Sequence, residues 1–110
     1  MKFTRTVFGA LAGLMLLGVA SAASAETPWE RHHPRRDEVI DRLQNQNHRI
    51  TEERREGDLT AAQAHRLRAA DYRIFHREQF DARHNDGHIT RAEQYRLNRA
   101  ENRVSRRIGR

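Results

Sequence analysis

The feature that most constrains the fold is an internal repeat, because residues 57–74 recur 30 positions later at residues 87–104 without a gap. Ten positions match: Gly57 with Gly87, Leu59 with Ile89, Thr60 with Thr90, Ala62 with Ala92, Gln63 with Glu93, Arg66 with Arg96, Leu67 with Leu97, Ala70 with Ala100, Arg73 with Arg103 and Ile74 with Val104. The chain therefore contains two related segments, 57–74 and 87–104.

Each copy of the repeat begins with signals that end one helix and start the next. A glycine permits the positive φ that closes the preceding helix. The threonine that follows, together with a Gln or Glu three residues later, has the spacing of a capping box. In a capping box the threonine oxygen accepts a hydrogen bond from a first-turn amide, and the longer side chain reaches back. The structural caps are Gly57, Thr60 and Gln63 in the first copy, and Gly87, Thr90 and Glu93 in the second.

Three helices are expected from the apolar spacing and from the positions of the breakers. No proline occurs after residue 36, and Val39, Ile40, Leu43 and Ile50 lie at helical spacing, which predicts a first helix over 37–55. The second helix is expected from Thr60 to about Ala82, and the third from Thr90 to about Arg107. Because the two glycine turns lie at opposite ends of the middle helix, the predicted fold is all-α, with three antiparallel helices.

The segment 1–25 has a different character from the rest of the chain. Lys2 and Arg5 precede an apolar run over 7–20, and small residues follow at 23–25, which is the layout of a cleavable secretory signal. The run is too short and too rich in Gly and Ala for a dependable membrane span. We therefore expect a periplasmic or secreted protein without a transmembrane segment in its mature form.

The segment 26–36 contains Pro28, Pro34 and the sole tryptophan, a composition that favours an extended, flexible arm over a regular element. The helical repeat domain is then expected over 37–110. After position 25, Leu, Ile, Val and Phe together make up only roughly 15% of the chain, below the level at which a packed core can be assumed. There is also no cysteine to form a disulfide. We expect a monomer of low stability, which homo-oligomerisation would strengthen.

The residue pattern argues against an enzyme. The chain has no cysteine, no Gly-x-Ser-x-Gly motif, no phosphate-binding glycine loop and no two-histidine helix motif. Ser105 is the only serine after position 25, and no base is placed to activate it. A chain this small and this polar cannot enclose a substrate cavity and still fold. We therefore expect a non-enzymatic protein with no cofactor.

The charge balance predicts an anionic partner. After position 25 the chain has 19 arginines, no lysine and 15 acidic residues, and the segment 91–110 alone holds seven arginines against two glutamates. Export argues against nucleic acid and leaves acidic or partly unfolded proteins, or the anionic envelope surface, as partners. Arginine suits this role because it pairs bidentately with carboxylates and phosphates. The predicted binding residues are Arg96, Arg99, Arg103 and Arg106, and the alternative is a solvated helix face.

A second function class is divalent-metal binding or sensing at the turn before the last helix. His84, Asp86 and His88 lie close together in the sequence, and Glu93 could complete a ligand set for zinc, copper or nickel. The same turn is a degenerate match to a calcium loop. With Gly87 at loop position six, two of the required oxygen ligands are missing.

Residues 57–63, Gly-Asp-Leu-Thr-Ala-Ala-Gln, resemble the LTxxQ signature of bacterial periplasmic stress proteins, a family of small helical chaperones and metal-responsive sensors. The second copy departs from it, with Ile89 and Glu93 in place of Leu and Gln. The segment 49–108 is also similar to short exported proteobacterial proteins with a GxLTxxE repeat, followed by Arg-Leu-Asn-Arg-Ala-Glu-Asn-Arg-Val-Ser-Arg, here residues 96–106. The resemblance implies a periplasmic, non-enzymatic role in stress handling or binding.

Overall fold

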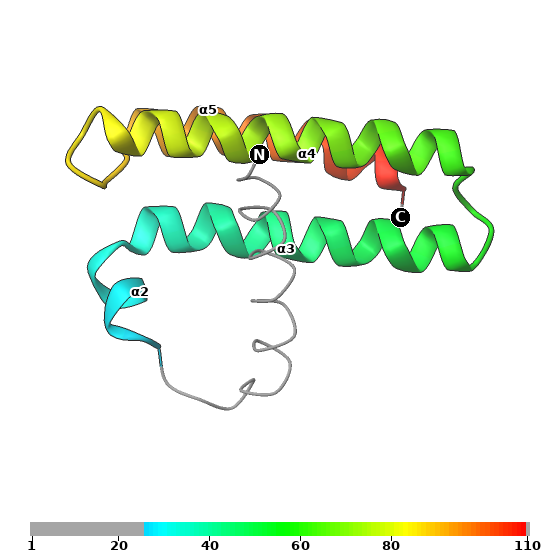
Figure 1. Ribbon diagram of the computed structural model, residues 1–110, viewed down its shortest axis with the longest axis horizontal. Coiled ribbons are helices and arrows are strands. Elements are labelled where there is room, and N and C mark those ends of the chain that lie inside the picture. Colours follow the sequence, from blue (N-terminus) through cyan, green and yellow to red (C-terminus); the bar gives the residue numbers. More distant parts are fainter. Residues whose placement is uncertain (1–25, 110) are drawn as a thin grey trace.

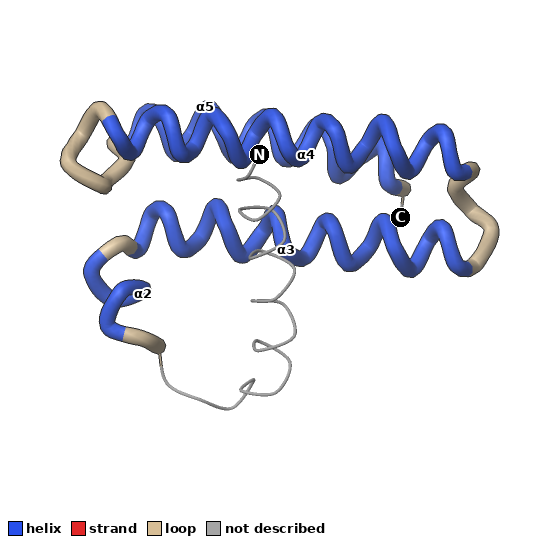
Figure 2. Tube along the Cα trace, viewed as in Figure 1, coloured by secondary structure: helices blue, strands red, loops and turns tan. Residues whose placement is uncertain are grey.

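The two glycine turns divide the chain where the repeat predicts. The computed structural model describes residues 26–109, and the predicted signal segment lies outside the described residues. Its helices are α2 (Pro28–His32), α3 (Pro34–Arg55), α4 (Ala61–Arg83) and α5 (Arg91–Ile108). Helices α3 and α5 run in the same direction and α4 runs against both (Figure 1). No strand occurs within residues 26–109 (Figure 2), and the all-α, three-helix prediction is confirmed.

Both repeat copies start their helices through the expected capping boxes. The Oγ1 of Thr60 accepts a hydrogen bond from the amide of Gln63 at 3.0 Å, and Gln63 Oε1 accepts one from the amide of Thr60 at 2.8 Å. Thr90 and Glu93 repeat this arrangement with the same two distances. Four amide groups that have no partner within their helix are thereby satisfied.

The turns that precede α4 and α5 both contain a left-handed residue. Gly57 and Gly87 each have φ of +86°, a conformation that side chains rarely allow. Asp86 also has positive φ, at 53°, which aspartate tolerates better than most residues. Leu59 and Ile89 lie two residues after the two glycines and are buried in the core.

Each long helix buries one narrow apolar stripe in the centre of the bundle. In α3 the stripe is Val39, Leu43 and Ile50, and polar Gln46 occupies the position between the last two. The full core consists of Val39, Leu43, Ile50, Leu59, Ala64, Leu67, Ile74, Phe75, Ala82, Ile89, Leu97, Val104 and Ile108. Because these side chains are few, polar contacts between the helices contribute much of the specificity of packing.

Residues 26–36 differ from the extended arm that the two prolines predicted. Pro28 is the first residue of α2 and Pro34 is the first residue of α3. Proline is favoured at this position, because its fixed φ suits the helix and its missing N–H would have no partner there. Thr27 and Glu30 form a third capping box, with hydrogen bonds of 3.1 and 2.7 Å. The two prolines therefore start helices here.

Helix α2 packs on the turn between α4 and α5 through stacked rings. The ring of Trp29 stacks on His33 with centroids 4.5 Å apart, and His33 stacks on His88 with centroids 4.7 Å apart. The guanidinium group of Arg36 lies 5.3 Å from the Trp29 ring centroid. This stack fixes the beginning of the described chain to the end of the bundle at which α4 turns into α5 (Figure 1).

An ion pair joins the start of α3 to α4. The Nε and Nη2 of Arg36 donate hydrogen bonds to the two carboxylate oxygens of Glu78 at 2.5 and 3.3 Å. Arg36 Nη1 also donates to the carbonyl of Gly87 at 3.1 Å. Because the side chain of Glu78 is fully buried, its charge depends on this partner.

Two further arginines of α3 bind α5. Arg49 donates to the hydroxyl of Ser105 and to the carbonyl of Gly109, both at 2.7 Å. It thereby caps the carboxyl end of α5, where carbonyl groups have no partner in the helix. Arg42 donates to Asn102 Oδ1 at 2.5 Å. The hydroxyl of Ser105 thus accepts a structural hydrogen bond.

Each of the three long helices contributes buried polar side chains. The Nε2 of Gln46 donates to Asp71 Oδ1 at 2.7 Å, while both carboxylate oxygens of Glu101 accept no hydrogen bond within residues 26–109. Arg42 Nη1 approaches Glu101 only to 3.6 Å. Burial, aided by the neighbouring carboxylates of Glu38, Asp71 and Glu78, outweighs this pairing and raises the pKa of Glu101 to about 9.

Burial also raises the pKa of Asp71 to about 7, although the hydrogen bond from Gln46 and the charges of Arg68 and Arg49 act in the opposite direction. The buried acidic side chains are therefore stabilised by protonation as well as by hydrogen bonds. With these pKa values Glu101 is protonated at neutral pH, and Asp71 changes its protonation state near pH 7.

The threonine caps give a first prediction. Thr60→Ala and Thr90→Ala should each lower the free energy of unfolding by about 1 kcal/mol, because each removes one hydrogen bond to a first-turn amide. Urea denaturation followed by circular dichroism measures this loss. The exposed helix position Asn45 provides the control, and Asn45→Ala should leave the free energy of unfolding within about 0.5 kcal/mol. An equal response of all three variants would contradict the capping role.

The buried acids give a second prediction, on pH. The pKa values of Glu101 and Asp71 lie higher in the folded than in the unfolded chain, so the folded chain binds more protons between about pH 4 and 9. Stability should therefore be fully present at low pH and fall as the pH rises through this window. The melting temperature is expected to be higher at pH 5 than at pH 8.

The variant Glu101→Gln tests the cause, because glutamine resembles the protonated acid at every pH. It should raise the melting temperature at pH 8 and flatten the dependence between pH 5 and 8. A gain of about 1 kcal/mol corresponds to about 4–8 °C for a domain of this size. If Glu101→Gln keeps the full dependence of the melting temperature on pH, Glu101 is not the source of that dependence.

Candidate functional site

Helices α4 and α5 form an open groove, and no residue of α3 lines it. The groove has a volume of about 680 Å³. Its floor is apolar and comes from both helices, with Ile74, Leu97 and Val104 nearly buried and Ala70 and Ala100 half-buried. The two alanines have little side-chain volume, so the helices approach closely and the space above them stays open.

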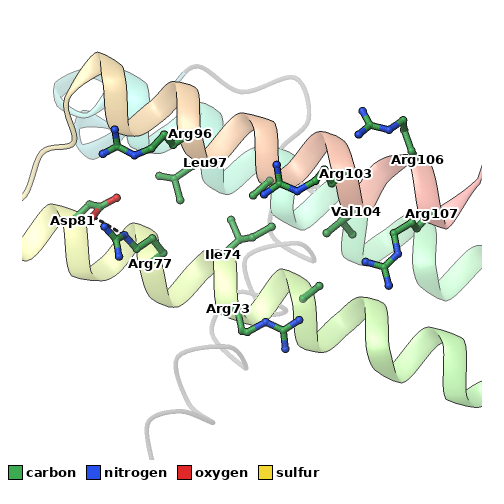
Figure 3. A pocket seen from close by; sticks show the side chains of 12 residues that line it. Arg73, Ile74, Arg77, Asp81, Arg96, Leu97, Arg103, Val104, Arg106 and Arg107 are labelled. Carbon is green, nitrogen blue, oxygen red and sulfur yellow. Dashed lines mark ion pairs between the residues drawn. The ribbon is translucent and has the colours of Figure 1, made fainter.

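Arginine side chains form both walls of this groove. Figure 3 shows Arg73 and Arg77 rising from α4, and Arg96, Arg103 and Arg107 from α5, around the apolar floor. The complete set of charged lining residues is Arg73, Arg77, Asp81, Arg96, Arg103, Arg106 and Arg107. Six guanidinium groups therefore face one carboxylate, and the groove has a strongly positive field.

Most of these arginines have no partner within the described chain. Arg77 Nε pairs with Asp81 Oδ1 at 3.1 Å, which uses the only carboxylate of the groove. The other five are exposed and make no hydrogen bond or ion pair with residues 26–109. We define these five, Arg73, Arg96, Arg103, Arg106 and Arg107, as the free groove arginines.

Three arginines of α3 differ from this set, because Arg36, Arg42 and Arg49 each donate hydrogen bonds to another helix. Free guanidinium groups of like charge that crowd one groove repel one another. An anionic ligand would relieve that repulsion and fill the unused donors.

The internal repeat accounts for the symmetry of the groove. Ala70 and Ala100 are equivalent in the two copies, as are Arg73 and Arg103, and both members of each pair line the groove. An antiparallel pair of helices with equivalent sequences presents the same side chains from both sides. The groove therefore has an approximate twofold arrangement, with arginines on each wall and alanines between them.

The predicted anion-binding residues separate into two groups. Arg96, Arg103 and Arg106 line the groove. Arg99 does not line the groove, and its guanidinium group lies 5.7 Å from the ring centroid of Tyr95. It instead borders a smaller hollow of about 160 Å³ that also involves Asn102, Arg103 and Arg106.

Three groove arginines were missing from the predicted site, which was drawn on α5 alone: Arg73, Arg77 and Arg107. Arg77 and Arg107 are themselves related by the offset of the internal repeat. Extending the repeat alignment beyond Ile74 would have added Arg77 and Arg107 to the matched positions.

The structure does not bring the four predicted metal ligands together. His84 Nδ1 lies 2.8 Å from the carbonyl of Phe80, and the His88 ring stacks on His33. Glu93 is engaged in its capping box. The metal prediction for His84, Asp86, His88 and Glu93 therefore stays a prediction that would require these side chains to rearrange.

Elsewhere in residues 26–109, three acidic side chains place ligand atoms within 4.8 Å of one another, namely Glu53, Glu56 and Asp58. They lie at the turn between α3 and α4. A side-chain hydrogen bond with Asp58 is the main cause that raises the pKa of Glu53 above its ordinary value.

Comparison with known proteins gives no relative from which a function could be transferred. No protein-family model matches the chain, and neither the curated proteins nor the solved structures provide a match. Within residues 26–109, no helix combines the length and the apolar character needed to cross a bilayer. The groove itself is therefore the main guide to function.

Proposed function

We propose that this protein is an exported, non-enzymatic helical binding protein that engages an anionic partner through the arginine groove between α4 and α5. The observation that carries the proposal is the set of five free groove arginines around an apolar floor. The partner is an acidic or partly unfolded protein, or the anionic surface of the envelope. The leader-like segment 1–25 supports export, and the resemblance to the LTxxQ stress proteins supports a chaperone-like role.

Binding in this groove would use two kinds of energy. Carboxylates or phosphates would pair with guanidinium groups that now face water, forming charge-assisted and often bidentate hydrogen bonds. Apolar groups of the partner would cover Ala70 and Ala100, which are half-buried. The arginine stems would add further apolar contact along the walls.

The anionic-partner proposal gives a third prediction. Poly-L-glutamate serves as a model acidic chain, and vesicles that contain phosphatidylglycerol serve as a model envelope surface. The variant Arg96→Gln/Arg103→Gln/Arg106→Gln removes three groove charges and preserves helix propensity. For the probe that the native chain binds more tightly, we expect the variant to have an affinity at least about tenfold lower than that of the native chain, equivalent to about 1.4 kcal/mol.

A charge-matched control separates the groove from net charge. Arg54, Arg83 and Arg91 are exposed, lie outside the groove and make no ion pair within residues 26–109. Changing these three to Gln should weaken binding by no more than about threefold, while binding by the native chain should weaken as NaCl increases. Equal losses in the two triple variants, with circular dichroism unchanged, would show that the groove has no special role.

A further inference from the structure

The form of the groove restricts the kind of anion that fits it, provided that the proposed function holds. Its buried side chains Leu97, Ile74 and Val104 are only 3–8% exposed, so the apolar surface that still faces water comes from half-buried Ala70 and Ala100 and from the arginine stems. A ligand must offer an apolar strip to remove these groups from water, and a purely polar polyanion would leave them exposed. The ligand is therefore amphipathic.

The distribution of charge restricts the ligand further. Figure 3 shows Arg96 near Arg77 toward one end of the groove, and Arg106 and Arg107 at the other end. Arg73 and Arg103 lie between the ends on opposite walls. A lipid carries its charge at one end only, whereas this groove calls for negative charges at intervals along both sides of an apolar strip. An acidic amphipathic helix has that pattern, because residues three and four apart share a face.

The bundle already shows how a helix packs on this pair. On the other side of α4 and α5, α3 inserts Val39, Leu43 and Ile50 as an apolar stripe. Polar contacts flank this stripe, such as the hydrogen bond from Gln94 Nε2 to Glu38 Oε1 at 3.0 Å. The groove offers a second surface on the same pair of helices, with its two alanines allowing close approach of a helix.

A second copy of this chain fits the groove less well than a foreign helix does. The large apolar side chains that the described chain exposes are Trp29, Phe80 and Tyr95, which belong to three different helices. They form no apolar stripe flanked by carboxylates. After position 25 the chain also has more arginines than acidic residues, 19 against 15, so two copies repel at long range.

We propose that the α4–α5 groove binds an acidic amphipathic helix of a partner protein, which packs its apolar stripe on Ala70, Ala100 and the arginine stems as a fourth helix on the bundle. The carboxylates beside that stripe pair with the free groove arginines on both walls. The partner segment folds on the groove, in keeping with a client that is partly unfolded when free.

Two labelled peptides of equal composition test this inference. Each has about 18 residues, roughly 27 Å as a helix, and contains Leu, Glu, Gln and Ala. In the first peptide leucines recur every three or four residues between glutamates. The second is a scramble that keeps the charge but has no apolar stripe. We expect fluorescence anisotropy to show at least about tenfold tighter binding of the first, with a gain of helical circular dichroism on mixing.

Variants distinguish contact with the floor from contact with the charges. Ala100→Leu fills the groove without changing its charge, so it should lower the affinity for the amphipathic peptide severalfold and leave the affinity for the scrambled peptide unchanged. The Arg96→Gln/Arg103→Gln/Arg106→Gln variant should lower the affinity for both peptides. The control variant at Arg54, Arg83 and Arg91 should lower neither affinity by more than about threefold. Ala62→Leu, at an exposed position of α4 outside the groove, is the matched control for Ala100→Leu.

The remaining outcomes overturn the inference in distinguishable ways. Equal groove-dependent binding of the two peptides would refute the helix and leave the proposed function intact. Groove-dependent preference for phosphatidylglycerol vesicles would identify a lipid ligand. Self-association abolished by the groove variant would identify a second copy as the ligand. Loss of all groove-dependent binding, to peptides, poly-L-glutamate and vesicles alike, would remove the proposed function as well.

Discussion

The arrangement of the bundle depends on the buried ion pair between Arg36 at the start of α3 and Glu78 in α4. Glu78 is fully buried, and its carboxylate accepts two hydrogen bonds from one guanidinium group that also binds the turn at Gly87. Removing one partner of a buried pair typically costs about 3–5 kcal/mol. A chain with so few large apolar residues has little stability to spare. This contact thus holds the start of α3 against α4 and against the turn at Gly87.

Arginine has two roles in this protein. Arg36 and Arg49 of α3 lie where acceptors are available, in the carboxylate of Glu78 and the hydroxyl of Ser105, so they hold helices together. The free groove arginines line a groove with a single carboxylate, that of Asp81, which already pairs with Arg77. The excess of arginine is therefore partly structural, and only the unpaired part is available to a partner.

Much of the fold could be predicted because its signals are local, whereas the site depends on which faces of two helices meet. A glycine followed by a capping box specifies where α4 and α5 begin, whatever the rest of the chain does. The prediction for Pro28 and Pro34 was wrong because proline breaks a helix from within but starts one at its first position. Thr27 was the local signal for the start at Pro28, whereas His33 before Pro34 forms no side-chain cap. The place of Arg73 in the groove requires the orientation of α4, which long-range packing determines. Buried Glu101 resembles a surface charge in the sequence, since only the folded chain shows that its neighbours exclude water.

The arginine side-chain Nε–H resonances of the folded protein provide the most direct test of this account. On titration with the acidic amphipathic peptide, ¹H–¹⁵N spectra should show the signals of Arg73, Arg96 and Arg103 shifting together with the amides along the groove. The signals of Arg36 and Arg49, which are already bonded within the bundle, should stay in place. Shifts concentrated on α2, α3 or the turn between α4 and α5, with the groove signals unmoved, would contradict the account.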